Sequence, residues 1–232
     1  MMILSLVLFA GTMIISLVAA ARVKSQFHKY SRVPASSGYT GAEAAAAILR
    51  AAGIHDVQIY EHQELLGDHY DPTHKRLVLS SENYHGTSTA ALGIAAHECG
   101  HAIQHQIAYA PLKMRMAAVG LTGIANQVVI WLPLIGLFGN IIPWQWAIML
   151  MAVSWGVLML FNLITLPVEF DASRRAKVIL QKMSFIRPGA EATAVNKVLD
   201  AAAMTYVAAF ITSLAYFLFY LLRLFLAPRE EH

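Results

Sequence analysis

Long stretches without charged side chains alternate with polar stretches along this chain. Residues 1–21, 116–168 and 201–222 contain no Asp, Glu, Lys or Arg. A helix needs about 20 apolar residues to cross a bilayer, so the middle stretch is long enough for two helices joined by a turn near Gly139 and Asn140. The pattern therefore predicts four membrane spans, near residues 2–21, 117–139, 145–167 and 202–226.

The segment after the first span begins with a polar connector and a short helix. Residues 22–40 are polar and contain Pro34, and we interpret them as the connector. Thr40 and Glu43 are spaced as a capping box in front of an alanine-rich run. This arrangement predicts a helix over about residues 41–52.

Two strands and a second helix follow. Polar and apolar side chains alternate over residues 56–62 and again over residues 75–80, which is the period of a strand. A second alanine-rich run, with Thr87 or Ser88 placed to cap it, predicts a helix that extends to about Gln106. The polar segment therefore has the predicted order helix, strand, strand, helix.

The composition agrees with a membrane protein and limits the expected partners. Hydrophobic residues make up 57% of the chain and charged residues only 13%, which is too apolar for an ordinary soluble domain. The net charge is +3, and the basic residues flank the spans rather than form one dense stripe, so we expect a lipid bilayer and no nucleic acid as partner. The single cysteine, Cys99, excludes an intrachain disulfide.

The basic residues also predict an orientation. Of the 17 lysine and arginine residues, nine lie in residues 22–116 and six in residues 169–198, which leaves Arg223 and Arg229. The positive-inside rule therefore places both segments in the cytoplasm and both termini outside. Cleavage after the small residues 19–21 would reverse this arrangement, and no basic residue precedes the first apolar run, so we interpret that run as an uncleaved anchor.

The stretch His97-Glu98-Cys99-Gly100-His101 has the form H-E-x-x-H and lies in the second predicted helix. Side chains four positions apart lie above one another on one helix face, so His97 and His101 can hold a zinc ion between them. Glu98 then lies beside the metal, where it can take a proton from a zinc-bound water. Cys99 points away from the metal face, and we expect it to pack within the protein.

A catalytic zinc site usually has a third protein ligand. His105 continues the stripe of histidines, but it is about 12 Å along the helix axis from His97, too far to share one metal. Glu169 follows two predicted membrane crossings, which return the chain to the same side, and we predict that it is the third ligand, with Asp171 as second choice. The alternative is that both acids solvate a helix end and pair with the two arginines that follow.

These residues predict hydrolysis of peptides by metal-activated water. Zinc lowers the pKa of its bound water to about 7, Glu98 removes the proton, and the hydroxide attacks a peptide carbonyl. Glu98 then passes the proton to the leaving amine. An exposed edge of the strand over residues 75–80 is expected to pair with an extended substrate. We assign no oxyanion-stabilising residue, although four side chains are near in sequence: His69, Tyr70, Tyr84 and His85.

Several short stretches also carry a resemblance to a known family. They are Gly41–Glu43, Asp68–Asp71, Ala95–Glu98 with Gly100–Gln104, Val168–Ala176, and Ala201–Ala203 with Thr205–Ala209. In these stretches the chain resembles the bacterial membrane-embedded neutral zinc metallopeptidases of the YugP type. The resemblance implies a zinc-dependent peptidase with His97, His101 and Glu169 as ligands and Glu98 as the catalytic residue.

A more distant similarity connects the chain to the CAAX-processing and heat-shock membrane metalloproteases. In those proteins an Asp four positions after the ligand Glu supports a ligand His. Here that position is Ser173 and not an acid, so the support expected from that Asp is missing unless Asp171 replaces it.

Together these observations predict an α-helical integral membrane protein with about four transmembrane helices and a small α+β zincin-like catalytic region. We expect a zinc endopeptidase of the bacterial plasma membrane that acts on peptides or membrane proteins at the cytoplasmic face. The alternative is a non-proteolytic membrane adaptor or chaperone with a structural zinc site, and a homo-oligomer or another membrane partner stays open. The expected division is a first transmembrane helix at 1–22, a cytoplasmic catalytic region at 23–116, a transmembrane hairpin at 117–167, a cytoplasmic segment with the third ligand at 168–198, and a last helix with a C-terminal tail at 199–232.

Overall fold

The computed structural model describes residues 2–63, 67–137 and 142–226 of the chain. The turn predicted near Gly139 and Asn140 lies outside the described residues. The chain divides into two compact units, each assembled from segments that are distant in the sequence. Long helices contribute residues to both units, and each unit is described by itself.

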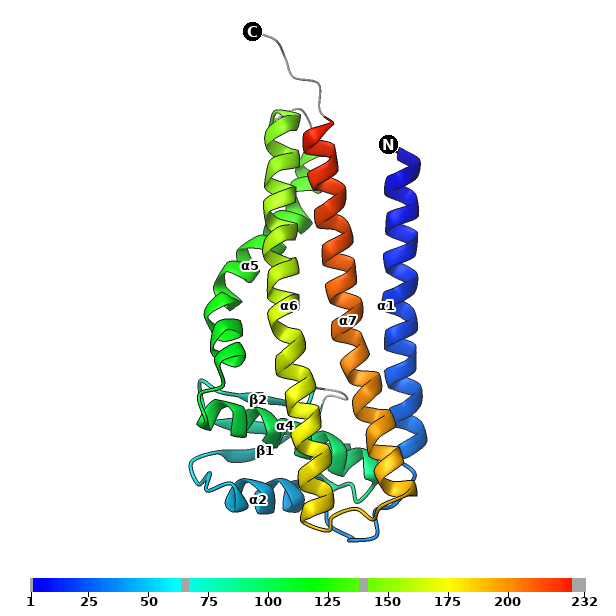
Figure 1. Ribbon diagram of the computed structural model, residues 1–232, viewed down its shortest axis with the longest axis vertical. Helices are drawn as coiled ribbons and strands as arrows, with labels where there is room; N and C mark the ends of the chain where they lie inside the picture. The colour runs from blue at the N-terminus through cyan, green and yellow to red at the C-terminus, as the bar shows by residue number, and fades with distance from the viewer. Residues whose placement is uncertain (1, 64–66, 138–141, 227–232) are drawn as a thin grey trace. The chain divides into compact units, whose positions relative to one another are not determined.

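Unit 1 comprises Met1–Leu17, Met114–Leu166 and Tyr206–His232, and it holds the apolar parts of four long helices. These helices, labelled in Figure 1, are α1 (Met2–Tyr30), α5 (Ala110–Leu137), α6 (Trp144–Lys182) and α7 (Ala190–Phe225). Among the described residues, these four helices are long and apolar enough to cross a membrane. The predicted fold class, mostly helical with four candidate spans and a small strand-containing region, is confirmed.

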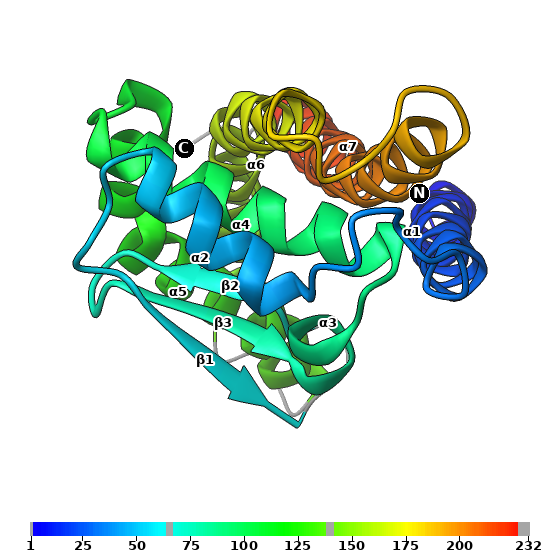
Figure 2. The same cartoon turned by 90° about the horizontal axis from the view of Figure 1, so that it is seen from below.

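Unit 2 comprises Val18–Lys113 and Pro167–Thr205. Its two shorter helices, α2 (Gly41–Ala51) and α4 (Thr89–Gln106), pack against each other, and both contact the sheet, as Figure 2 shows. The capping box predicted at Thr40 is present, because α2 begins with reciprocal hydrogen bonds between Thr40 and Glu43. Strands lie within both stretches in which they were predicted, residues 56–62 and 75–80. The ends of α6 and α7 complete the core of this unit.

The sheet of unit 2 has three strands in the order β1 (Gln58–His62), β3 (Arg76–Ser80) and β2 (His69–Asp71). β1 is parallel to β3, and β2 is antiparallel to it. Neither the short β2 nor the short helix α3 (Ser81–His85) was predicted. Because β3 is the central strand, the prediction of an exposed edge at residues 75–80 is wrong, and the edge strands are β1 and β2.

The end of α1 also corrects the sequence analysis. α1 continues to Tyr30, so the interpretation of residues 22–40 as a polar connector is wrong for its first nine residues. The physical reason is Phe27, which is buried in a small cluster with Ala90 and Val198 and so stabilises the helix beyond its apolar stretch. The basic side chains of its last turn also suit the negative end of a helix dipole.

Candidate metal centre

Helix α4 carries the H-E-x-x-H stretch, and its remaining faces are buried in the core of unit 2. Ser88 caps the helix by accepting a hydrogen bond from the backbone N–H of Ala91 (3.1 Å). Cys99 is fully buried, its Sγ lies 3.7 Å from the backbone oxygen of Ala45, and burial raises the pKa of its thiol well above the ordinary value. Cys99 therefore packs as expected and is not a reactive thiol.

A close approach of two helix backbones brings the third candidate ligand to α4. A Cβ atom on Gly100 would lie only 2.8 Å from the backbone oxygen of Ala172 and 3.1 Å from its Cα, so only a glycine allows α6 to pass this near. Ala172 lies three residues after Glu169, which places the carboxylate one helical turn away on α6. Residues on two distant segments of the chain thus meet within unit 2.

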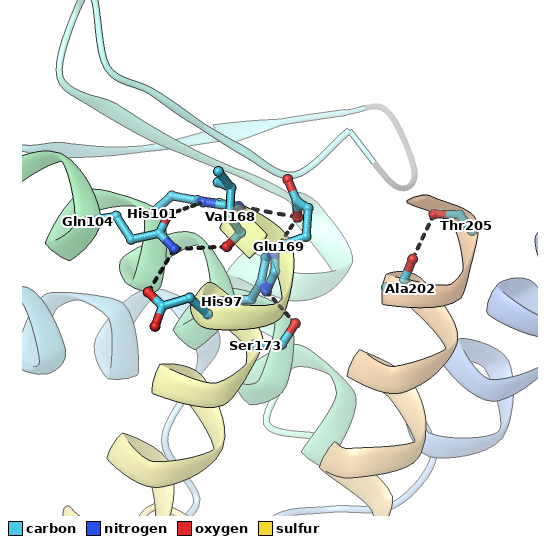
Figure 3. A network of polar contacts seen from close by, with 9 residues as sticks. His97, His101, Gln104, Val168, Glu169, Ser173, Ala202 and Thr205 are labelled. Carbon is cyan, nitrogen blue, oxygen red and sulfur yellow. Dashed lines mark hydrogen bonds and ion pairs between the residues drawn. The ribbon is translucent and has the colours of Figure 1, made fainter. Parts of the chain in front are cut away.

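Three ligand atoms converge at this crossing, as Figure 3 shows. Oε2 of Glu169 lies 3.3 Å from Nε2 of His97 and 3.5 Å from Nε2 of His101. The two imidazole rings are nearly perpendicular, with centroids 4.7 Å apart. Within the described part of the chain, this is the only group of at least three His, Cys, Asp or Glu side chains with ligand atoms so close.

The donor set and its spacing fit zinc. Two imidazole nitrogens and one carboxylate oxygen form a donor set found in catalytic zinc sites. With metal–ligand bonds of about 2.0–2.1 Å and tetrahedral angles, neighbouring ligand atoms lie about 3.3 Å apart. The distances of 3.3 and 3.5 Å from Oε2 of Glu169 to the two nitrogens match that separation. His97, His101 and Glu169 therefore suit one zinc ion without rearrangement of these pairs.

Burial and charge both shape this centre. Glu169 is only 1% exposed in the middle of α6, so the alternative in which it solvates a helix end is wrong. For His101, burial lowers the pKa, but the hydrogen bond to Glu169 and the charges of Glu98 and Glu169 outweigh burial and hold the pKa above its ordinary value. The pocket is therefore electronegative and attracts a cation, either a proton or a metal ion.

Gln104 fixes the ring of His101, a role that the sequence analysis missed. The Gln104 side chain is fully buried, and its Nε2 donates to the backbone oxygen of Val168 (2.8 Å) and to Oδ2 of Asp171 (3.0 Å). Its Oε1 therefore accepts from Nδ1–H of His101 (3.1 Å), which leaves the Nε2 lone pair of His101 free for a metal. The available signal was an amide three positions after His101 on an otherwise alanine-rich buried face.

Ser173 supports the other histidine. Its Oγ lies 3.2 Å from Nδ1 of His97, where the hydroxyl oxygen can accept the ring N–H and direct Nε2 toward Glu169. Asp171 contacts neither ring in this way. It accepts hydrogen bonds from Gln104, Arg174 and Arg175 and so acts on His101 only through Gln104. Ser173, and not Asp171, thus contacts the ring of a candidate ligand directly.

The other candidates from the sequence have partners elsewhere. His105, one turn beyond His101, lies with Nδ1 2.9 Å from the hydroxyl of Tyr70, and burial raises the pKa of that tyrosine to about 12. His69 hydrogen-bonds the backbone oxygen of Gly67, and His85 pairs with Glu61. No oxyanion-stabilising residue is therefore assigned.

The chain is similar to known zinc peptidases. The sequence model of a family described as "Putative neutral zinc metallopeptidase" matches residues 5–225. The chain is 44% identical over 218 residues to the "Putative membrane protease YugP" of Bacillus subtilis (strain 168), across 94% of this chain and 95% of that protein. No solved structure shows a significant match. The resemblance seen in the sequence is thus confirmed, and the chain belongs to this family of neutral zinc metallopeptidases.

Proposed function

We propose that this protein is a zinc-dependent endopeptidase of a bacterial plasma membrane, with Glu98 as its catalytic residue. The observation that carries the proposal is the convergence, among the described residues, of one carboxylate and two imidazoles at zinc-ligand spacing. Structural zinc sites close with four protein ligands, whereas catalytic sites have three and keep an open position. The donor set among the described residues favours the catalytic class over an adaptor or chaperone with a structural zinc.

The position and the surroundings of Glu98 suit it for proton transfer. It follows His97 directly on α4, it is only 7% exposed, and its carboxylate is not engaged in a hydrogen bond or ion pair with any described residue. Its charge also acts on the neighbouring His101. An unengaged carboxylate in a partly dehydrated site can accept a proton at an oxygen atom and later give it to an amine nitrogen.

The positions of these residues suggest a separate role for each of them in the proposed reaction. When bound, zinc supplies Lewis acidity, which lowers the pKa of water and polarises a peptide carbonyl. His97, His101 and Glu169 would hold the ion, while Gln104 and Ser173 keep the two rings in the orientation that presents Nε2. Glu98 takes the proton of the attacking water and delivers it to the leaving nitrogen.

The side of the membrane is part of the proposal. All lysine and arginine residues except Arg115, Arg223 and Arg229 belong to unit 2, which also contains the candidate metal centre. Such an excess of basic residues is typical of the cytoplasmic side of bacterial membrane proteins. We therefore expect hydrolysis at the cytoplasmic face, on peptides or on segments of membrane proteins.

The test is Glu98→Gln in the purified full chain, assayed on casein or a model peptide. An amide cannot accept the proton of water, so hydrolysis is expected to fall by about 10²-fold or more while zinc content stays near that of the unmodified protein. The matched control is Glu82→Gln, which changes an exposed carboxylate on α3. Hydrolysis by Glu98→Gln at the unmodified rate would remove Glu98 as the base.

A further inference from the structure

A cavity separate from the candidate metal centre lies entirely within unit 1. Its volume is about 390 Å³, and helices α1, α5, α6 and α7 all contribute to its wall. Among the described residues that line it, none is charged, but several are polar. They include Ser16, Asn126, Trp155, Asn162 and Thr212.

Several of these polar groups lie deep in the apolar stretches. Asn126 lies 11 residues after Arg115, and Thr212 lies 11 residues before Arg223. At 1.5 Å per residue, each is about 16 Å along its helix from the nearest charged side chain, which is about half the thickness of a hydrocarbon core. Polar side chains at that depth are rare and mark sites of interaction.

Part of this polar lining has no partner among the described residues. Nε1 of Trp155 and Oγ1 of Thr212 are buried and form no hydrogen bond with the described residues. Asn126 is exposed on α5, and its side-chain amide also forms no hydrogen bond with them. By contrast, Asn162 donates to the backbone oxygen of Ala209 (3.2 Å) and to Oγ of Ser213 (3.0 Å), which joins α6 to α7.

Unpaired donors and acceptors are unfavourable in hydrocarbon, because no water is available there to satisfy them. The missing partner must offer uncharged hydrogen-bonding groups, since no charge in the lining would neutralise an ionised one. Lipid headgroups and esters lie at the interface, about 15 Å from the bilayer centre, and do not reach this depth. Side-chain amides and hydroxyls of another membrane-spanning helix do reach it.

We infer that this cavity binds a transmembrane helix of another protein that carries an Asn, Gln, Ser or Thr side chain near its middle. Ser16 and Asn126 are exposed at the rim, so such a helix can enter from the surrounding lipid. The view that this helix belongs to a substrate rests on the proposed function. The binding itself does not.

The binding experiment uses full-length Glu98→Gln protein in phosphatidylcholine vesicles, so that no hydrolysis occurs. The probe is a synthetic helix of about 20 leucines with lysines at both ends, a dansyl group, and either Asn or Leu at its centre. Energy transfer from protein tryptophans to dansyl reports binding. The Asn peptide is expected to bind about 3- to 20-fold more tightly than the Leu peptide, as single interhelical hydrogen bonds do.

A matched pair of variants locates the effect. Asn126→Leu is expected to abolish the preference for the Asn peptide. Gln127→Leu is expected to keep it, because Gln127 lies outside the cavity and its Oε1 accepts from Nε1 of Trp131 (2.7 Å). A photoreactive leucine beside the central Asn is expected to crosslink to α5, α6 or α7 at residues of the cavity wall.

Three results would overturn the inference. The first is equal affinity of the protein for the two peptides. The second is an equal loss of the preference for the Asn peptide in Asn126→Leu and Gln127→Leu. The third is conversion of a dimer to a monomer by Asn126→Leu with peptide binding unchanged. The last result would make the cavity an interface between two copies of this chain. Protein with native Glu98 is assayed in parallel on a soluble peptide, because loss of peptide binding with normal hydrolysis contradicts this inference alone, whereas absent hydrolysis contradicts the proposed function.

Discussion

Gln104 on α4 and Asp171 on α6 are joined by a hydrogen bond of 3.0 Å between Nε2 and Oδ2, although 67 residues separate them in the chain. The same amide group hydrogen-bonds His101 and the backbone oxygen of Val168. One buried side chain thus ties two segments of unit 2 together and orients a candidate metal ligand. A donor and an acceptor are both required, so no apolar side chain of similar shape can replace it.

The first prediction concerns this amide. Gln104→Met keeps the length of the side chain but removes its three hydrogen bonds, so we expect zinc affinity to fall by about 10- to 100-fold. A competition titration with a zinc chelator measures the change. The control is Gln106→Met, at the exposed last residue of the same helix, and equal zinc affinities of the two variants would remove Gln104 as a positioning residue.

The second prediction concerns the helix crossing. Gly100→Ala places a Cβ against the backbone of Ala172, and we expect a loss of stability of about 1–3 kcal/mol together with weaker zinc binding. Gly93→Ala on the same helix is the control, because its Cβ would be 3.5 Å from the nearest atom of Val195, an ordinary contact. Thermal unfolding of both variants tests this contrast. A stable, zinc-replete Gly100→Ala protein would contradict the close approach.

The third prediction concerns pH. Zinc and a proton compete for Nε2 of His101, and the pKa of His101 in the metal-free protein is raised above 6.5. Protonation of the His101 ring stabilises the metal-free fold. This stabilisation is fully present below the pKa of His101 in the unfolded chain, about 6.5, and is lost as pH rises through the pKa of His101 in the folded protein. Zinc should therefore add more stability at about pH 8 than at about pH 6. Equal stabilisation at both pH values would contradict this coupling.

The fourth prediction concerns orientation. Ser36 is exposed in unit 2, and we expect a cysteine there, in a Cys99→Ala background, to react with an impermeant maleimide only after the membrane is opened. Probes at Asn140 and next to His232 should react in intact cells, although both positions lie outside the described residues. Labelling of Ser36 in intact cells would place the candidate metal centre on the outer side.

Much of the helical architecture was predictable because it depends on local patterns. Apolar stretches longer than a bilayer is thick predicted the four candidate spans, and the i, i+4 spacing predicted that His97 and His101 share a face. Glu169 followed from a topological argument, since two crossings return the chain to one side. The structure brings these three side chains together.

The features that sequence analysis missed depend on contacts between distant segments. Strand order cannot be read from the alternation of residues 75–80, so the central position of β3 was not foreseen. α1 continues past its apolar stretch because Phe27 packs on Val198, a partner far along the chain. The roles of Gln104 and Ser173 likewise require the α4–α6 crossing, which no single-segment pattern reveals.

The most direct test of the central claim is the amount of zinc bound per chain in three purified proteins: the unmodified chain, Glu98→Gln and Glu169→Gln. If His97, His101 and Glu169 are the ligands and Glu98 is the base, the first two proteins should each bind about one zinc and Glu169→Gln far less. Melting curves of all three establish that each is folded. Two results would contradict the assignment: a full complement of zinc in Glu169→Gln, or loss of zinc in Glu98→Gln but not in Glu169→Gln.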